Sequence, residues 1–163
     1  MRVFTKMNTP IDELYLVADE NELSVIHLGE EDFNRHENLE EIVYQPEHPA
    51  LRIAAGQLEE YFAGKRTSFD LPLFIQGTSF QQAVWEQLQN IPFGETRSYL
   101  DIAESIHNPK AVRAIGQANK ANRFPIIIPC HRVIGKNQSL TGYAGTRIDI
   151  KEKLLRHEGI FIK

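Results

Sequence analysis

The 163-residue chain has a single cysteine, Cys130, which excludes an internal disulfide framework and any multi-cysteine zinc site. We therefore expect no metal centre. Apolar runs are also short, and none approaches the ~20 residues that a membrane span needs. The N-terminal stretch M-R-V-F-T-K-M-N-T-P lacks the apolar core of a signal peptide. We expect a cytoplasmic, monomeric protein with no membrane segment.

Charge is unevenly distributed between the two halves of the chain. Residues 1–77 carry 15 Asp and Glu against 6 Lys and Arg, a net charge of -9, whereas residues 78–163 carry 7 against 12, a net charge of +5. This split predicts two domains, 1–77 and 78–163, of which only the second suits a polyanion such as nucleic acid. The alternative is that both halves merely carry solvated charged faces.

The first half is predicted to combine a small antiparallel sheet with a helix and to act as a scaffold. Strand-forming residues on either side of the polar turn D-E-N-E indicate a β-hairpin over residues 12–28. An acidic loop is expected over 29–41. Apolar residues at helical spacing predict a helix over 49–63, and a short strand is expected near T-S-F-D-L.

The second half is predicted to be mainly helical and winged-helix-like, which places the whole chain in the α+β class. Helical periodicity predicts helices over about 79–88, 99–106 and 109–121. Asn108 is expected to cap the last of these, with Pro109 at its first position. Two short helices joined by a brief turn match a helix-turn-helix, although any helical hairpin gives a similar pattern.

The helix predicted over 109–121 carries two stripes at helical spacing. The apolar stripe consists of Ala111, Ala114, Ile115 and Ala118. The second, basic and rich in small residues, consists of Arg113, Gly116, Gln117 and Lys120. Small residues on the second stripe would let the helix backbone approach a groove of nucleic acid closely.

Cys130 stands in the stretch I-I-I-P-C-H-R-V-I-G, residues 126–135. The isoleucines predict a buried strand that ends at Pro129, so that the thiol lies at the end of the strand rather than in its middle. A lone cysteine is often an inert buried residue, but His131 and Arg132 favour a nucleophilic thiolate. Because adjacent side chains of a strand point to opposite faces, contact between Cys130 and His131 would need a bend or a bridging water.

A closing helix is predicted around K-E-K-L-L-R-H-E-G, residues 151–159, with Ile150 and Leu154 on its apolar stripe. Glu158 is a second anomaly, since it continues this stripe in the last turn, where the helix dipole disfavours negative charge. Either the last turn frays, or Glu158 points inward to hold His131 or His157 in a carboxylate–imidazole–nucleophile arrangement.

The loop S-L-T-G-Y-A-G, residues 139–145, carries Tyr143 between two glycines. Tyr143 either stacks on a base or is an ordinary surface aromatic.

Six ordered motifs of the second half resemble the O6-alkylguanine-DNA alkyltransferases, also called methylated-DNA–protein-cysteine methyltransferases. They are F-Q-Q-A-V-W at 80–85, I-P-F-G-E-T at 91–96, R-A-I-G-Q-A at 113–118, P-C-H-R-V-I-G at 129–135, G-Y-A-G at 142–145 and L-L-R-H-E-G at 154–159. Residues 1–77 match only in general plan. Arg123 stands where proline is common in the family, and Thr146 where glycine is common, which concerns loop shape rather than chemistry.

The resemblance implies that Cys130 takes the alkyl group from guanine, that His131 activates the thiol through a water, and that Glu158 orients the imidazole. It implies that Tyr99 lies near the flipped base and assists protonation of the leaving guanine, and that Asn122 braces the active-site turn. Transfer would be irreversible, with one turnover per molecule and no cofactor. The partner would be double-stranded DNA containing O6-alkylguanine.

The resemblance also implies a base pocket and a DNA-binding surface. The pocket residues would be Pro125, Val133, Tyr143 and Ala144. Arg113 would fill the gap left by the extruded nucleotide, with the helix at 109–121 in the minor groove. The DNA-contacting residues would be Tyr99, Asn108, Ala111, Arg113, Gly116, Gln117, Lys120 and Lys136.

Two other functions stay open on the sequence. One is a non-catalytic DNA-lesion-binding or winged-helix regulatory protein whose cysteine is structural. The other is a cysteine hydrolase that uses Cys130, His131 and Glu158. The hydrolase interpretation leaves Arg113 and the basic helix without a purpose.

Overall fold

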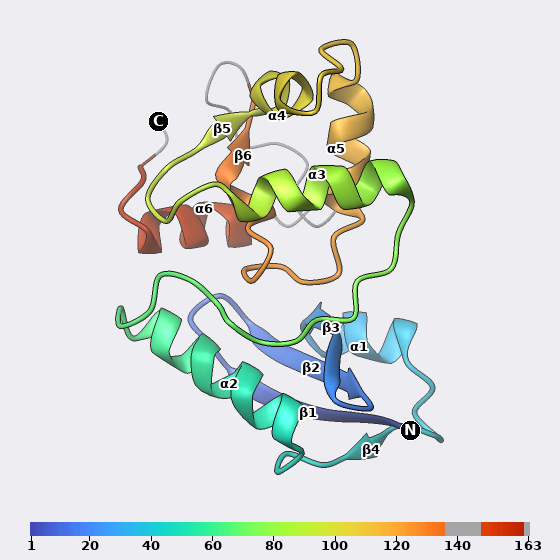
Figure 1. The fold of residues 1–163 in the computed structure, drawn as a ribbon. Coiled ribbons are helices and arrows are strands. Elements are labelled where there is room, and N and C mark those ends of the chain that lie inside the picture. Colours follow the sequence, from blue (N-terminus) through green and yellow to red (C-terminus); the bar gives the residue numbers. More distant parts are fainter. Residues whose placement is uncertain (136–147, 162–163) are drawn as a thin grey trace. The chain divides into compact units, whose positions relative to one another are not determined.

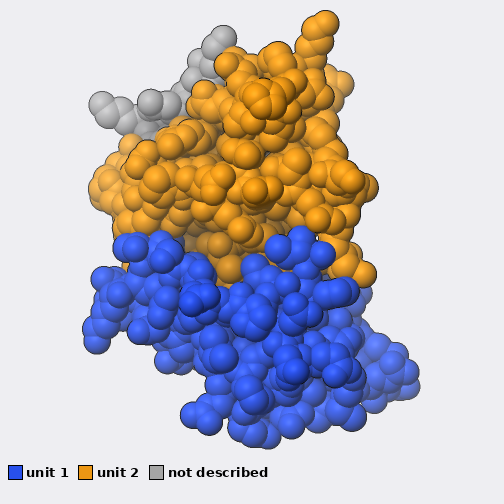
Figure 2. Space-filling model, viewed as in Figure 1, with its two compact units in different colours: residues 1–75 blue, residues 76–163 orange. Residues whose placement is uncertain are grey.

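The computed structural model describes residues 1–135 and 148–161. The chain forms two compact units, residues 1–75 and 76–163, which Figure 2 colours separately. The change in charge had suggested a boundary at residue 77. Both units mix helices with strands (Figure 1), so the predicted α+β class is confirmed. Among the described residues, no helix is long and apolar enough to cross a membrane.

The first unit is built on a four-stranded sheet with the order β3-β2-β1-β4. Its strands are β1 (Arg2–Asn8), β2 (Glu13–Asp19), β3 (Glu22–Leu28) and β4 (Val43–Tyr44). Neighbours β1, β2 and β3 pair antiparallel, whereas β4 joins β1 in parallel. The hairpin predicted over 12–28 is confirmed as β2 and β3; the sequence had not singled out β1.

Two helices accompany this sheet. Helix α2 (Pro49–Phe62) confirms the helix predicted over 49–63, and His48 caps it by accepting from the Ala50 N–H at 3.2 Å. Helix α1 (Glu30–His36) lies where a loop was expected. That prediction was wrong because α1 has one buried residue, Phe33, instead of an apolar stripe; its ring stacks on Tyr15 with centroids 4.4 Å apart.

The strand expected near T-S-F-D-L is not among the described elements. Instead, Leu73, in the next stretch of chain, forms an isolated parallel bridge with Leu23 of β3. The Leu23 N–H donates to the Pro72 carbonyl at 3.0 Å, and the Phe74 N–H donates to the Leu23 carbonyl at 2.8 Å. Pro72 has no N–H to donate, which limits further pairing at this edge.

The second unit contains four α-helices in its described part. They are α3 (Ser79–Gln89), α4 (Tyr99–Ser105), α5 (Val112–Lys120) and α6 (Ile148–His157). The predicted helices are thus confirmed, with α5 shorter than expected. Thr78 and Gln81 form a capping box at the start of α3, and Ser98 and Asp101 form one at α4. Helix α5 packs against both α3 and α4.

The start and the buried face of α5 differ from prediction. Asn108 and Pro109 do not begin the helix, because residues 108–111 form a separate turn in which the Ala111 N–H donates to the Asn108 carbonyl at 3.0 Å. The N-cap is Ala111, which makes no side-chain capping bond. The buried residues of α5 are Ile115, Ala118 and Asn119, whereas Ala114 is exposed.

Candidate active site

Cys130 sits in a tight turn rather than at the mouth of a strand. Pro129 has φ -78° and ψ 64°, the geometry of an inverse γ-turn, and the Cys130 N–H donates to the Ile128 carbonyl at 2.7 Å. The 3-10 helix η1 (Cys130–Arg132) follows directly. Ile126 has φ 78°, which a β-branched residue rarely adopts. The strand predicted over 126–128 was therefore wrong, although all three isoleucines are buried.

Two asparagine side chains hold this turn. The Asn122 amide donates to the Ile128 carbonyl at 2.8 Å, and its oxygen accepts from the Phe124 N–H at 2.9 Å. Asn119, on α5, donates to the Cys130 carbonyl at 3.3 Å. The asparagines satisfy backbone groups that a strand would have paired in a sheet. They fix the turn to the end of α5.

A two-stranded parallel sheet brings Tyr99 to the chain that leaves this turn. Strand β5 (Arg97–Ser98) pairs with β6 (Val133–Ile134), with Arg97 opposite Val133. Tyr99 follows β5 directly and is the first residue of α4. The sheet therefore joins segments far apart in sequence, one carrying Tyr99 and the other following Cys130.

His131, Arg132 and Glu158 form a buried cluster. His131 Nε2 lies 2.7 Å from Glu158 Oε2, and neither side chain is exposed. Arg132 donates to the two carboxylate oxygens through Nε at 2.8 Å and Nη2 at 3.0 Å, and through Nη1 to the Ile91 carbonyl at 2.7 Å. Of the two histidines considered for Glu158, the structure places His131 in contact. The sequence did not identify Arg132 as the other partner.

Burial sets the protonation of His131. It lowers the pKa of the imidazole, although Glu158 acts in the opposite direction. The neutral ring donates Nε2–H to the Glu158 carboxylate, which leaves the lone pair on Nδ1. That nitrogen is buried and has no hydrogen-bond partner within the part of the chain that the structure describes. An atom of this kind suits a bridging water.

Burial also raises the pKa of the Cys130 thiol to about 11. The Asn122 side chain and the Lys151 ammonium favour the thiolate, but burial outweighs them. The expectation that His131 and Arg132 hold Cys130 as a thiolate is therefore wrong, because the imidazole is neutral and the guanidinium is paired with Glu158. The thiol needs a base when it reacts.

Lys151 is a site residue that the sequence analysis missed. Its ammonium donates to the Val133 carbonyl at 2.6 Å and lies 5.9 Å from the centroid of the Tyr99 ring. Burial lowers the pKa of Lys151 to about 8. Lys151 precedes the buried Leu155 by one helical turn. A charged residue on the buried stripe of a helix indicates a candidate site residue, and Lys151 gave this signal just as Glu158 did.

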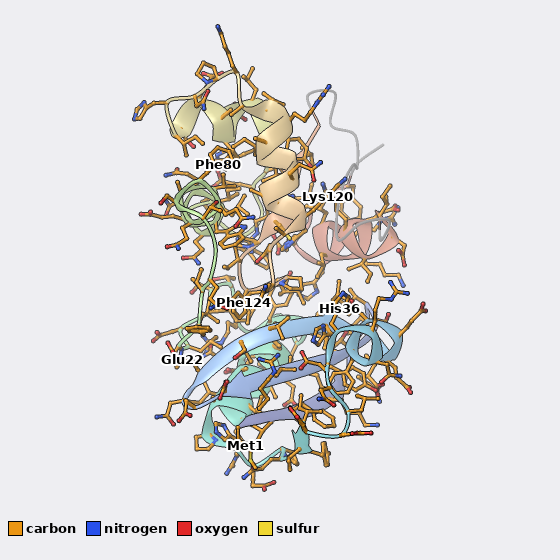
Figure 3. The ribbon with its side chains drawn as sticks, turned by 90° about the vertical axis from the view of Figure 1, so that its right-hand side faces the viewer. Met1, Glu22, His36, Phe80, Lys120 and Phe124 are labelled. Carbon is orange, nitrogen blue, oxygen red and sulfur yellow. The ribbon has the colours of Figure 1, made fainter. Side chains whose placement is uncertain are left out.

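The residues expected to contact DNA on and before α5 are solvent-accessible. Asn108, Arg113, Gln117 and Lys120 are exposed, while Ala111 and Gly116 are partly exposed. Lys120, near the end of α5, is labelled in Figure 3. A Cβ added at Gly116 would meet nothing within 4 Å. Packing within the protein therefore does not require a glycine at this position.

The residues expected to line the base pocket are described only in part. Pro125 and Val133 are buried, and Tyr99 is partly exposed. Lys136, Tyr143 and Ala144 lie outside the described residues. The Cys130 carbonyl accepts from the Asn119 side chain and from the Val133 N–H, and the Val133 carbonyl accepts from Lys151.

Comparison with known families matches both units. Residues 79–160 match the model of the 6-O-methylguanine DNA methyltransferase DNA binding domain, and residues 3–75 match that of the 6-O-methylguanine DNA methyltransferase ribonuclease-like domain. The chain belongs to the O6-methylguanine DNA methyltransferase family. The resemblance drawn from the motifs is thereby confirmed, and it extends to the first unit.

Relatives of known name support this membership. The chain is 49% identical over 163 residues to the constitutive methylated-DNA–protein-cysteine methyltransferase of Bacillus subtilis, covering 100% of this chain and 99% of the relative. Among solved structures, the O6-methylguanine methyltransferase of Mycobacterium tuberculosis is 42% identical with a TM-score of 0.84, covering 97% of this chain and 93% of the other. The M. tuberculosis protein in complex with DNA is 40% identical with a TM-score of 0.84, covering 96% and 93%.

Proposed function

We propose that this protein repairs O6-alkylguanine in double-stranded DNA by moving the alkyl group to Cys130. The observation that carries the proposal is the buried cluster beside the thiol: a neutral His131, held at Nε2 by Glu158, with its Nδ1 lone pair unused by the described residues. Membership of the family and the M. tuberculosis relative solved with DNA point to the same chemistry.

The transfer step is a displacement at carbon. Cys130 Sγ attacks the alkyl carbon, a C–S bond forms, the C–O6 bond breaks, and its electron pair goes to the guanine. The thiol proton passes through a water to His131 Nδ1, while Glu158 stabilises the imidazolium that forms. Tyr99 assists protonation of the leaving guanine, with the Lys151 ammonium close to its ring. Asn122 holds the turn that presents the thiol.

The product is a thioether, which accounts for a single turnover. None of the groups placed at the turn supplies a route for hydrolysing a C–S bond. Each molecule therefore repairs one lesion, and the reaction needs no cofactor because protein side chains supply the nucleophile and the base. The second unit carries the transfer and DNA binding, and the first unit acts as a scaffold.

DNA is bound through the accessible face of α5 and the residues around it. An alkylated base inside a duplex must be extruded before the thiol can reach it. Arg113 is exposed on α5 and occupies the vacancy in the duplex. The bare backbone at Gly116 lets α5 approach the minor groove. Phosphate contacts from this basic unit make binding weaken as salt rises.

The decisive experiment is stoichiometric labelling. Protein incubated with excess duplex containing O6-methylguanine should gain one methyl group, on the peptide that carries Cys130, with repaired DNA limited to one equivalent. Repair that continues beyond one equivalent, or a label on another residue, would contradict the proposal. Lesion binding by wild-type protein without any methyl transfer would indicate a non-catalytic binding protein. Burst kinetics on an ester without DNA would indicate a cysteine hydrolase.

A further inference from the structure

Three potential metal ligands meet in the first unit, outside the proposed active site. His27 lies in β3, and Asp32 and His36 follow on successive turns of α1; His36 is labelled in Figure 3. One donor atom from each residue lies within 4.8 Å of the other two. His27 Nδ1 is 3.4 Å from Asp32 Oδ2, and His36 Nδ1 is 3.0 Å from Asp32 Oδ1.

We propose that His27, Asp32 and His36 bind a divalent transition-metal ion, with Zn²⁺ as the preferred occupant. Imidazole nitrogen and carboxylate oxygen are ordinary zinc ligands at about 2.0–2.2 Å, and two such ligands in a tetrahedral site lie roughly 3.3 Å apart. Here His27 Nδ1 and His36 Nδ1 lie 3.4 Å and 3.0 Å from the two different oxygens of Asp32, so both rings border the same carboxylate. His36 Nδ1 also lies 2.9 Å from the Asp32 backbone carbonyl, and the metal replaces this hydrogen bond when it binds. A water completes the fourth position.

The groups behind the ligands favour metal binding. His27 Nε2 lies 2.7 Å from Glu37 Oε2, so the ring donates its Nε2–H to that carboxylate and turns Nδ1 toward Asp32. Arg2 fixes Glu37 through two bonds of 2.8 Å and 3.0 Å. The Leu28 N–H donates to Asp32 Oδ2 at 3.1 Å. A histidine ligand whose second nitrogen donates to an anchored carboxylate is the usual outer arrangement of protein zinc sites.

The charges around the cluster also favour a cation. Two carboxylates face His27, with Asp32 Oδ2 3.4 Å from Nδ1 and Glu37 Oε2 2.7 Å from Nε2. A metal ion between His27, Asp32 and His36 supplies positive charge beside these carboxylates when the two imidazoles are neutral. Protons therefore compete with the metal, and affinity rises with pH.

The expectation of no metal centre rested on the single cysteine, whereas histidine and carboxylate side chains also bind zinc. The bound ion joins the end of β3 to α1, a seven-residue helix with one buried side chain. Its role is to secure α1 on the sheet, independently of alkyl transfer at Cys130. A failed metal test would therefore leave the proposed repair activity standing, and the reverse also holds.

The test is a titration of metal-free full-length protein with Zn²⁺ against a chromogenic chelator. We expect one equivalent to bind, and His36→Ala and Asp32→Asn each to weaken binding at least about 10-fold. Glu37→Gln should weaken it by roughly 10-fold through the orientation of His27. His107→Ala removes an exposed histidine of the second unit and serves as the matched control, with unchanged affinity. The Co²⁺-substituted protein should show d–d bands without a thiolate charge-transfer band.

Three results would overturn the site. The first is failure of wild-type protein to retain one equivalent of Zn²⁺. The second is equal affinity in wild type, His36→Ala and Asp32→Asn. The third is loss of binding in Cys130→Ser with full binding in His36→Ala, which would locate the ion at the thiol. His36 is exposed, so its variant should fold, and circular dichroism checks that it does.

Discussion

The two units differ in the charge that they bury. In the first unit, aromatic and aliphatic side chains such as Tyr15, Val17 and Phe33 fill a core beside α1. In the second unit, four ionisable side chains beside the thiol have at most 5% exposure: His131, Arg132, Lys151 and Glu158. Buried ion pairs contribute little net stability compared with apolar packing. The second unit therefore gives up stability to hold four ionisable groups together beside the thiol, whereas the first unit buries one such pair, His27 with Glu37, beside its apolar core.

The largest effect is expected for Glu158→Gln. The change removes the charge that orients His131 and leaves the buried Arg132 guanidinium uncompensated. We expect the single-turnover rate to fall by about 10²–10³-fold and the free energy of unfolding to fall by about 3–5 kcal/mol. Stopped-flow transfer assays and urea unfolding measure the two effects.

Glu152→Gln is the matched control, because Glu152 forms an exposed pair with Arg156 at 2.9 Å on α6. Its loss should change unfolding free energy by no more than about 0.5 kcal/mol and leave transfer unchanged. If Glu158→Gln weakened DNA binding as much as it slowed transfer, its role would be structural only.

Arg113→Ala should slow transfer from duplex DNA by about 100-fold. Without Arg113 in the vacancy of the duplex, extruding the base costs a few kcal/mol more. Reaction with free O6-benzylguanine needs no extrusion and should keep its rate. Arg52→Ala, which removes an exposed arginine from α2, is the control in the acidic unit. An equal loss on the free base would remove Arg113 from the extrusion step.

The buried charges should also give stability an unusual pH dependence. Burial lowers the pKa of Lys151 from 10.5 to about 8, so between these values the unfolded chain holds a proton that the folded chain has lost. Stability therefore rises with pH, by about 1.4 kcal/mol per pH unit from this group. The Cys130 thiol acts in the opposite sense between 9.0 and about 11, because the unfolded chain loses its proton first.

Urea unfolding across pH 7–10.5 separates the two groups. Relative to Lys151→Met, wild type should gain stability from about pH 8 to about pH 10.5. The absolute stability of wild type should level off above about pH 9, where the thiol opposes this gain. Cys130→Ser should continue to gain stability above pH 9, because the opposing thiol is gone. Identical pH profiles for wild type and Lys151→Met would show that the Lys151 ammonium is not perturbed by folding.

The smallest effects are expected when either of two glycines within helices is changed to alanine. A Cβ added at Gly56 in α2 or at Gly116 in α5 would meet nothing within 4 Å. Each change to alanine should therefore stabilise its helix by about 0.5–1 kcal/mol. Under the proposal that α5 binds the duplex, Gly116→Ala alone should weaken DNA binding, several-fold. Thermal melts and salt-matched binding assays check both; weaker DNA binding by Gly56→Ala would contradict the assignment of DNA contact to α5.

The sequence predicted the regular elements better than the turn that matters most. The hairpin of β2 and β3 and helices α2 to α6 follow from periodicity. The isoleucines before Cys130 suggested a strand because β-branched residues favour extended backbone. Hydrogen bonds from the side chains of Asn122 and Asn119 to the Ile128 and Cys130 carbonyls favour the γ-turn instead. Propensity along the chain does not reveal such bonds.

The site was predictable where a residue broke a local pattern. Glu158 interrupts an apolar stripe, and its inward orientation followed from that anomaly. Arg132 gave no such signal, because a cation beside a cysteine also fits a thiolate. Only the fold shows that Arg132 reaches both Glu158 and the Ile91 carbonyl. The protonation state of Cys130 depends on burial, which residue types alone do not determine.

The cluster that joins Glu158 to His131 and Arg132 has a consequence for synthesis. Glu158 lies 27 residues beyond His131, and Ile91 lies 41 residues before Arg132. A ribosome-bound chain that has just exposed Cys130 lacks the carboxylate that neutralises Arg132. Burying that arginine unpaired is unfavourable, so the turn should stay open and hydrated until Glu158 emerges. The buried contacts of Glu158 with His131 and Arg132 therefore form only after α6 has been made.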